Sequence, residues 1–182
     1  MVKIKEFDVK NEINEFTIEQ FENVSRILND EDVEKFERWA NLLIYLGVPE
    51  SEVYDLEFSE FVEYIKIFSD TKVKPSNEFC KVIELDGYTY TSHEDELKIS
   101  VREMKMIEKQ VSNHPHNYIS YLMSVLFKRK DLTKAEHYTD AHIKQKAKLF
   151  SSLSAELAIP YATFIGLKLS NRLQNAPTEV VE

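Results

Sequence analysis

Apolar side chains recur every three or four residues through most of the first seventy residues, which is the period of an amphipathic helix. The pattern predicts helices over about 17–28 and 32–46, and a third helix that ends near residue 69. Thr17 and Gln20 have the spacing of a capping box, and Gly47 is typical of a helix end. The positions expected to face inward are Phe21, Val24, Ile27, Leu28, Val33, Phe36, Trp39 or Ala40, Leu43, Leu46, Phe58, Phe61, Val62, Ile65 and Phe68.

Two other stretches have the alternating pattern of extended chain. Residues 1–16 alternate apolar and charged side chains, which indicates an extended arm or an edge strand. Residues 79–91 place β-branched and aromatic side chains on both sides of Asp86 and Gly87. A two-residue Asp-Gly loop is typical of a type I′ turn, in which both residues have positive φ. Because an isolated hairpin is marginally stable in water, we expect it to pack on the helices or to gain another strand.

Helical spacing returns after the hairpin. Ser100 and Glu103 form a second capping box, and the Asn-His-Pro sequence at 113–115 predicts the end of the helix that follows. Residues 117–128 are apolar on more than one face. We therefore expect that segment to be a helix at the centre of the core.

The remaining pattern predicts a helix over about 140–150 and a last one that begins at Pro160, since proline fits the first turn of a helix. Together the elements predict an α+β fold that is mainly α-helical, with helical lobes flanking one β-hairpin. We expect a helical lobe over residues 1–70, a linker and hairpin over 71–97, and a second helical lobe over 98–182 that ends in a frayed tail. The alternative is a single compact domain.

Charge separates the two expected lobes. Residues 1–70 carry 18 acidic and 7 basic side chains, a net charge of −11, and we call them the acidic lobe. Residues 98–182 carry 8 acidic and 13 basic side chains, a net charge of +5, and we call them the basic lobe. The 6 acidic and 3 basic side chains of residues 71–97 complete the total of −9. Halves of opposite sign favour docking to a partner or to another copy of the chain.

The composition predicts an ordinary globular protein of 182 residues. No apolar run approaches the roughly 18–20 residues that a membrane span needs, so we expect no membrane association. The first residues lack the apolar stretch of a secretory signal. Cys80 is a lone cysteine, which cannot form an internal disulfide. We therefore expect a cytosolic protein.

The residues that could carry chemistry form no recognisable catalytic or metal-binding pattern. His137 and His142 are five residues apart, so they do not share a helix face as zinc ligands do, and we expect the histidines to lie in loops or on the surface. Cys80 lies in a strand pattern and is expected to be a structural thiol. The three glycines are too scattered to form a phosphate-binding loop. The sequence therefore predicts that the protein is not an enzyme and has no cofactor or metal.

The candidate site is a group of four cations, Lys128, Arg129, Lys130 and Lys134, which we call the basic cluster. Further lysines follow at 144, 146 and 148, and few carboxylates lie between them. The cluster is either a solubilising face around a loop or a docking patch for an acidic protein surface. Nucleic acid is the weaker partner, because the whole chain is acidic and Tyr138 is the one aromatic residue among these cations.

In its overall layout the chain resembles the small helical proteins of tailed bacteriophages that act in virion or tail assembly, including tail-assembly chaperones. The resemblance covers mainly residues 84–170: the segments 84–90 and 97–103, then Tyr118 through Arg129, and a last helix that contains Phe164. In such proteins a short hairpin precedes a capped helix, and the last helices carry a basic residue followed by a phenylalanine stripe.

The resemblance implies a non-enzymatic structural or assembly protein that binds other phage proteins during virion or tail morphogenesis. Its location would be the host cytoplasm or the virion, and self-association into a homo-oligomer is an open alternative. A second function is an acidic phage-encoded inhibitor whose carboxylates occupy a basic groove of a host nucleic-acid enzyme. Such an inhibitor needs carboxylates at phosphate-like spacing on one face, whereas an assembly protein needs an apolar or mixed docking patch.

Overall fold

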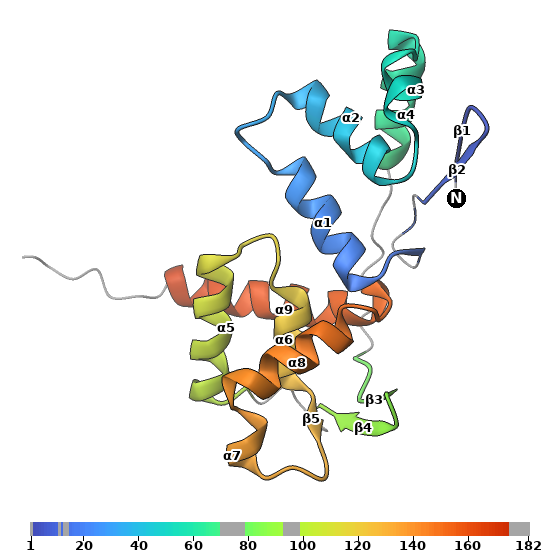
Figure 1. Ribbon diagram of the computed structural model, residues 1–182. Coiled ribbons are helices and arrows are strands. Elements are labelled where there is room, and N and C mark those ends of the chain that lie inside the picture. Colours follow the sequence, from blue (N-terminus) through green and yellow to red (C-terminus); the bar gives the residue numbers. More distant parts are fainter. Residues whose placement is uncertain (1, 11, 13–14, 70–78, 93–98, 175–182) are drawn as a thin grey trace, which may run out of the picture.

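The computed structural model describes residues 2–10, 12, 15–69, 79–92 and 99–174, and over these residues the protein is mainly α-helical with two small antiparallel sheets (Figure 1). This confirms the predicted α+β class. The helices are α1 (Ile18–Leu28), α2 (Lys35–Tyr45), α3 (Glu50–Tyr54), α4 (Phe58–Ser69), α5 (Val101–Asn113), α6 (Ile119–Leu126), α7 (Lys134–His137), α8 (Asp140–Phe150) and α9 (Ala155–Gln174). The strands are β1 (Val2–Ile4), β2 (Phe7–Val9), β3 (Val82–Leu85), β4 (Tyr88–Thr91) and β5 (Lys128–Arg129).

The predicted caps and turns form as expected. Thr17 and Ser100 both make complete capping boxes, at the starts of α1 and α5. Gly47, just after α2, has φ of 103°. Asp86 and Gly87 have φ of 53° and 73°, so the β3–β4 hairpin turns as a type I′ loop should. These local motifs fix where the elements begin and end.

The hairpin is completed by a strand that the sequence pattern did not reveal. Thr91 and Tyr90 pair with Lys128 and Arg129, which places β4 between β3 and β5. With two residues, β5 is too short to show any alternation. The first residues of the chain form the separate β1–β2 hairpin, which is more folded than the arm or edge strand expected there.

The conformation at Gly87 gives a testable prediction. Gly87→Ala should lower the free energy of unfolding by about 1 kcal/mol, because an L-residue resists positive φ. An added Cβ would meet no atom within 4 Å, so no steric clash contributes. Gly166→Ala is the matched control: it has the same open surroundings but lies in α9, where alanine should stabilise the helix by about 0.5–1 kcal/mol. Urea denaturation that moved both variants in the same direction would contradict this account.

Two hydrophobic cores form among the described residues. One fills the basic lobe around α6, where Leu122 is fully buried, as predicted for the central helix. Helices α8 and α9 pack against α6. The β3–β4 hairpin contributes Ile83 and Tyr90 to the same core. The smaller core lies in the acidic lobe, between the β1–β2 hairpin and helices α2 and α3. Its members are Ile4, Val9, Ala40, Leu43, Val48 and Val53.

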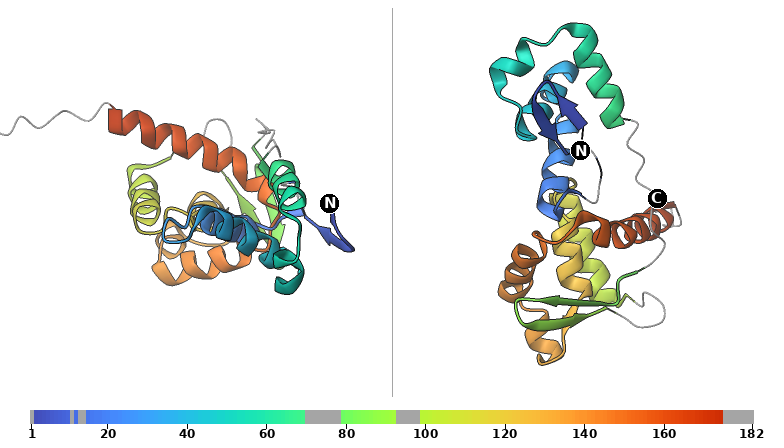
Figure 2. Two further views of the ribbon diagram at one scale, coloured as in Figure 1. Left: turned by 90° about the horizontal axis from the view of Figure 1, so that it is seen from above. Right: turned by 90° about the vertical axis from the view of Figure 1, so that its right-hand side faces the viewer.

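Helix α1 joins the two lobes, as the views in Figures 1 and 2 show. Its first residue, Ile18, belongs to the core of the basic lobe, and its amide donates to the carbonyl of Leu153 over 2.8 Å. Glu22 is buried, and its Oε1 accepts from the amides of Ile119 (2.5 Å) and Ser120 (3.0 Å) at the start of α6. The division of the chain near residue 70 remains a prediction, since residues 71–78 and 93–97 of the expected linker and hairpin lie outside the described residues.

The last helix begins five residues before Pro160, so the predicted start is wrong. The Ala155 amide donates to the carbonyl of Phe16 over 2.9 Å, and Ser154 pairs with Thr17 in an antiparallel bridge. This pairing fixes the start of α9, and Pro160 lies inside the helix.

Several side chains that the helical pattern placed inside are half-buried or exposed. Trp39 is half-buried, while its neighbour Ala40 is buried. Phe36 is 56% exposed and Phe58 is 67% exposed, although both belong to predicted inward stripes. Helix α4 buries no residue completely, because the small core of the acidic lobe cannot cover seven apolar or aromatic side chains among its twelve residues. The acidic lobe therefore presents aromatic rings to solvent.

Candidate protein-binding site

The basic cluster is partly built into the fold of the basic lobe. The Lys128 Nζ lies 2.8 Å from Oε1 of Glu103, a carboxylate that is fully buried. The Tyr138 hydroxyl donates to the same oxygen over 2.5 Å, and the Ser100 amide donates to Oε2 over 2.7 Å. Burial alone would raise the pKa of Glu103, but these partners outweigh it and lower the pKa to about 2. Lys128 is thus the counter-charge of a buried carboxylate.

The other members of the basic cluster differ in their surroundings. Arg129 forms two hydrogen bonds with Asp131, of 2.7 and 2.5 Å, and its guanidinium lies 3.8 Å above the ring centre of Tyr88. Lys130 is exposed. Lys134 begins α7, and its side chain lies outside the described part of the structure. The docking role of the four residues remains a prediction.

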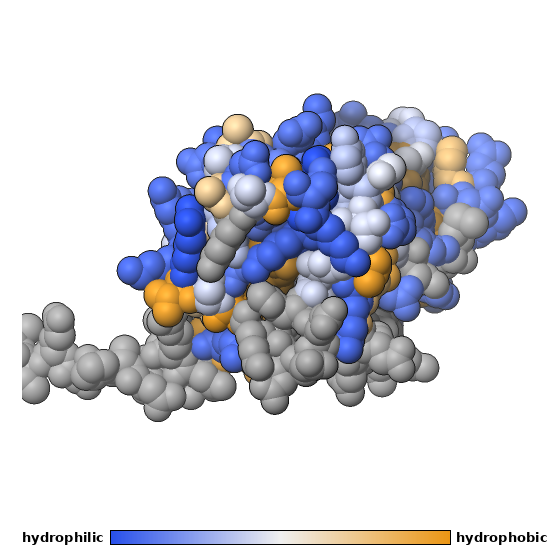
Figure 3. All heavy atoms as spheres, turned by 90° about the horizontal axis from the view of Figure 1, so that it is seen from below, coloured by the Kyte–Doolittle hydropathy of each residue, from blue (hydrophilic) through white to orange (hydrophobic). Residues whose placement is uncertain are grey.

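The face on which α7 and the turn after β5 lie is mostly hydrophilic. In Figure 3 the coloured side chains of that face are largely polar, and hydrophobic ones occur in separate spots. The described side chains of this face offer charge without a continuous apolar surface. Partners would meet it mainly through exposed charges, which contribute little to affinity at ordinary salt concentrations.

Behind the basic cluster lies a buried lysine. Lys146 is 1% exposed, and its Nζ donates to the carbonyl of Phe127 over 2.8 Å and lies 3.2 Å from Nδ1 of His137. Burial, with Lys128 and Arg129 nearby, lowers the pKa of Lys146 to about 7. Lys146 therefore does not belong to the solvated lysine face that the sequence suggested.

The histidine prediction is wrong for His137, which is buried, and His142 is half-buried. Burial, together with Lys146 and Lys128, lowers the pKa of His137 to about 3, so this imidazole is neutral near pH 7. The Nε2 atom of His142 is buried and has no hydrogen-bond partner in the described part of the structure. Cys80 is a half-buried free thiol. Among the described residues, no group of three or more potential ligands could hold a metal ion.

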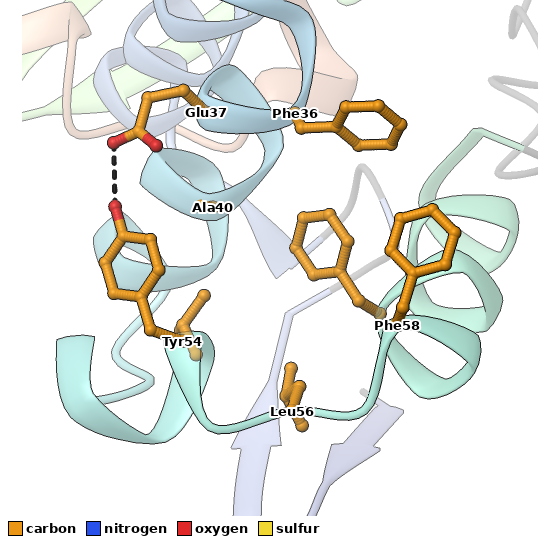
Figure 4. Close-up of a pocket in the computed structure, with 8 residues that line it drawn as sticks. Phe36, Glu37, Ala40, Tyr54, Leu56 and Phe58 are labelled. Atoms are coloured by element: carbon orange, nitrogen blue, oxygen red, sulfur yellow. Dashed lines mark hydrogen bonds between the residues drawn. The ribbon is translucent and has the colours of Figure 1, made fainter.

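A different site lies in the acidic lobe, where helices α2, α3 and α4 meet around a pocket of about 220 Å³ (Figure 4). We call it the aromatic pocket. Rings from three elements line it: Phe36 from α2, Tyr54 from α3, and Phe58 and Phe61 from α4. The remaining lining residues are Glu37, Ala40, Val53 and Leu56.

The local fold explains why these rings stay exposed. Ala40 lies one turn after Phe36 and packs in the small core of the acidic lobe. Phe36 is on the same side of α2 but beyond the buried residues, at the edge of the buried face. Its ring meets Phe58 edge to face, with centroids 5.7 Å apart, and Phe61 at 6.5 Å. The Tyr54 hydroxyl donates to Oε1 of Glu37 over 2.7 Å on the other side of the pocket. The rings contact one another, and Phe36, Tyr54 and Phe58 remain exposed while Phe61 is half-buried.

Carboxylates are frequent on the elements that form the aromatic pocket, and Glu37 lines the pocket itself. Residues 50–63 carry six acidic side chains and no lysine or arginine. One of the six, Glu52, is paired with the Lys5 Nζ at 2.7 Å. The aromatic pocket is therefore an apolar hollow with a negatively charged rim.

The helical pattern assigned three of the four rings of the aromatic pocket, Phe36, Phe58 and Phe61, to the core, and it gave no role to Tyr54. Helical spacing identifies which side chains share a face, and it does not show whether another element covers that face. The available signal was the excess of apolar residues in 58–69 over what one helix face can bury. The acidic residues between them on 50–63 were a second signal.

Among the described helices, none is both long enough and apolar enough to cross a membrane. No protein-family model, curated protein or solved structure matches this chain.

Proposed function

We propose that the protein is a non-enzymatic binding protein whose aromatic pocket receives an apolar side chain of another protein. The observation that carries the proposal is the exposure of Phe36 (56%) and Phe58 (67%) beside one another over the pocket. Aromatic side chains that remain exposed together are costly to hydrate, and they are enriched at the points of highest affinity in protein interfaces.

The dimensions of the aromatic pocket favour a protein segment over a small molecule. Pockets for drug-sized ligands and cofactors usually measure about 300–1,000 Å³. At about 220 Å³ this pocket is smaller, and it suits one large apolar side chain of a partner. The exposed rings and charged rim then provide the surrounding contact surface of an ordinary interface.

The positions of the perturbed groups support a function without catalysis. Glu103, His137 and Lys146, whose pKa values are strongly shifted, are all buried in the basic lobe. Glu103 is paired with Lys128, and Lys146 contacts the carbonyl of Phe127 and the ring of His137. Contacts of this kind are typical of a structural network. Structural networks of buried charges also shift pKa values, and a shifted group is a candidate for catalysis when it lies in a cleft.

Virion or tail morphogenesis of a bacteriophage is the proposed setting, with other phage structural or assembly proteins as partners. The layout resemblance of residues 84–170 supports it. The aromatic pocket favours this role over an acidic inhibitor of a nucleic-acid enzyme, because such an inhibitor needs carboxylates and gains nothing from exposed rings.

The test is selection of binding peptides from a random display library on the immobilised full chain. We expect the wild type to retain peptides that the double variant Phe36→Ser, Phe58→Ser binds at least about 30-fold more weakly, since loss of a hot spot costs about 2 kcal/mol or more. The matched control is Val101→Ser, Leu167→Ser, which removes two comparably exposed apolar side chains (69% and 62%) from the basic lobe. Peptides that bind both double variants and the wild type equally would overturn the proposal.

A further inference from the structure

We infer that the partner segment carries lysine or arginine residues on both sides of the apolar side chain that enters the aromatic pocket. The inference rests on the proposed function and specifies the chemistry of the partner. The charges around the pocket, rather than its rings, determine this chemistry.

The carboxylates of the rim lie on all three helices that form the aromatic pocket. Glu37 lines it from α2, and its Oε1 accepts the hydrogen bond of Tyr54. Glu57 and Glu60 flank Phe58 at the start of α4, and both are exposed. Glu50 and Asp55 are exposed at the two ends of α3. An occupant would therefore meet negative charge on more than one side.

Few cations of the acidic lobe counter this charge. Lys5 is paired with Glu52 and is also close enough to Asp55 and Glu60 to interact with their charges. The Arg38 side chain turns back to main-chain oxygens, with Nε 2.7 Å from the carbonyl of Val33. Lys35 is exposed at the first position of α2, and Lys66 lies in the last turn of α4, two turns from Phe58. Lys5 therefore offsets part of this charge, and the six carboxylates of residues 50–63 still outnumber it.

This charge pattern selects among possible occupants. An acidic segment, a nucleic acid or an anionic membrane surface would bring negative charge to the carboxylate rim and be repelled. A segment with lysine or arginine beside an apolar anchor would be attracted during approach and would pair with the rim once bound. Because the rim is exposed, we expect its effect to decrease with salt, whereas burial of the anchor should depend little on salt.

The experiment repeats the peptide selection with a variant that neutralises the rim, Glu37→Gln, Glu57→Gln, Glu60→Gln. The glutamine introduced at position 37 would keep an acceptor for the Tyr54 hydroxyl, so the pocket should keep its shape. The matched control, Glu19→Gln, Asp140→Asn, Glu156→Gln, changes the net charge equally at three exposed carboxylates on other elements. We expect wild type and control to select anchors flanked by lysine or arginine. These peptides should bind the rim variant about tenfold more weakly and with less dependence on salt.

The outcomes separate the inference from the proposed function. Peptides that need Phe36 and Phe58 but show no excess of flanking cations would overturn the inference and leave the proposed function standing. Absence of any peptide that depends on those rings would overturn both. Wild-type dimerisation in sedimentation that Phe36→Ser, Phe58→Ser abolishes would show that a second copy fills the pocket, and would also overturn the inference.

Discussion

Lys128→Met is expected to lower the free energy of unfolding by about 3 kcal/mol at pH 7, because it leaves the buried carboxylate of Glu103 without its cation. The Tyr138 hydroxyl and the Ser100 amide would remain as hydrogen-bond donors. The double variant Lys128→Met, Glu103→Gln should recover part of the loss, since no buried charge is then unpaired. Urea denaturation of the three proteins measures both effects.

The pH dependence of this loss identifies its cause. Glu103 has a pKa of about 2 in the folded protein, below its ordinary value near 4.5. Its contribution to stability is therefore complete above about pH 4.5 and is lost as the pH falls towards 2. The difference between wild type and Lys128→Met should shrink over that range. An unchanged denaturation midpoint at pH 7 would contradict the assigned role of Lys128.

Lys146 should make stability increase with pH above neutrality. Its pKa is about 7 in the folded protein and near 10.5 when unfolded. Below pH 7 both states hold the proton, and the cost of burying the charged amine is present in full. Between pH 7 and about 10 the unfolded state binds more protons, so stability should rise by up to about 1.4 kcal/mol per pH unit. Nearby Lys128 and Arg129 reinforce the burial effect, and His137 stays neutral over this range.

The test compares Lys146→Met with Lys144→Met, which removes an exposed lysine of the same helix. We expect Lys146→Met to be more stable than wild type at pH 7 by about 1–4 kcal/mol, with the advantage vanishing near pH 10. Lys144→Met should follow the wild-type curve. Parallel stability–pH curves for wild type and Lys146→Met would show that the buried amine carries no such cost.

Much of the fold follows from local sequence signals. The capping boxes at Thr17 and Ser100, the Asp86-Gly87 turn and the apolar segment around Leu122 were predicted and are confirmed. Each depends on residues close together in the chain. The start of α9 was mispredicted because it depends on a main-chain bond to Phe16, which lies far away in sequence.

The burial of Lys146 could have been predicted from its helical spacing relative to apolar residues of α8. Lysines at 144 and 148 lie two residues on either side of it, and residues two apart on a helix point in different directions. Ile143, Lys146 and Phe150 instead share one face of α8, and all three are buried. Residue type alone groups Lys146 with its solvated neighbours, whereas helical spacing separates them.

The exposed rings of the aromatic pocket could not be derived from periodicity. Phe36 and Phe58 have the spacing of core residues, and their exposure depends on how much of α2 and α4 the small core of the acidic lobe can cover. That coverage is a property of the tertiary packing. A candidate binding surface therefore appears where the helical pattern predicted burial.

The most direct test of the central claim is to map the bound peptide on the protein by NMR. A selected peptide is titrated into labelled protein, and the amide shifts of the aromatic pocket are compared with those around the basic cluster. The account predicts that the largest shifts fall on residues 36–61 of the acidic lobe and disappear in Phe36→Ser, Phe58→Ser. Shifts centred on residues 128–134, unchanged in that variant, would show that the basic cluster is the docking surface and would contradict the account.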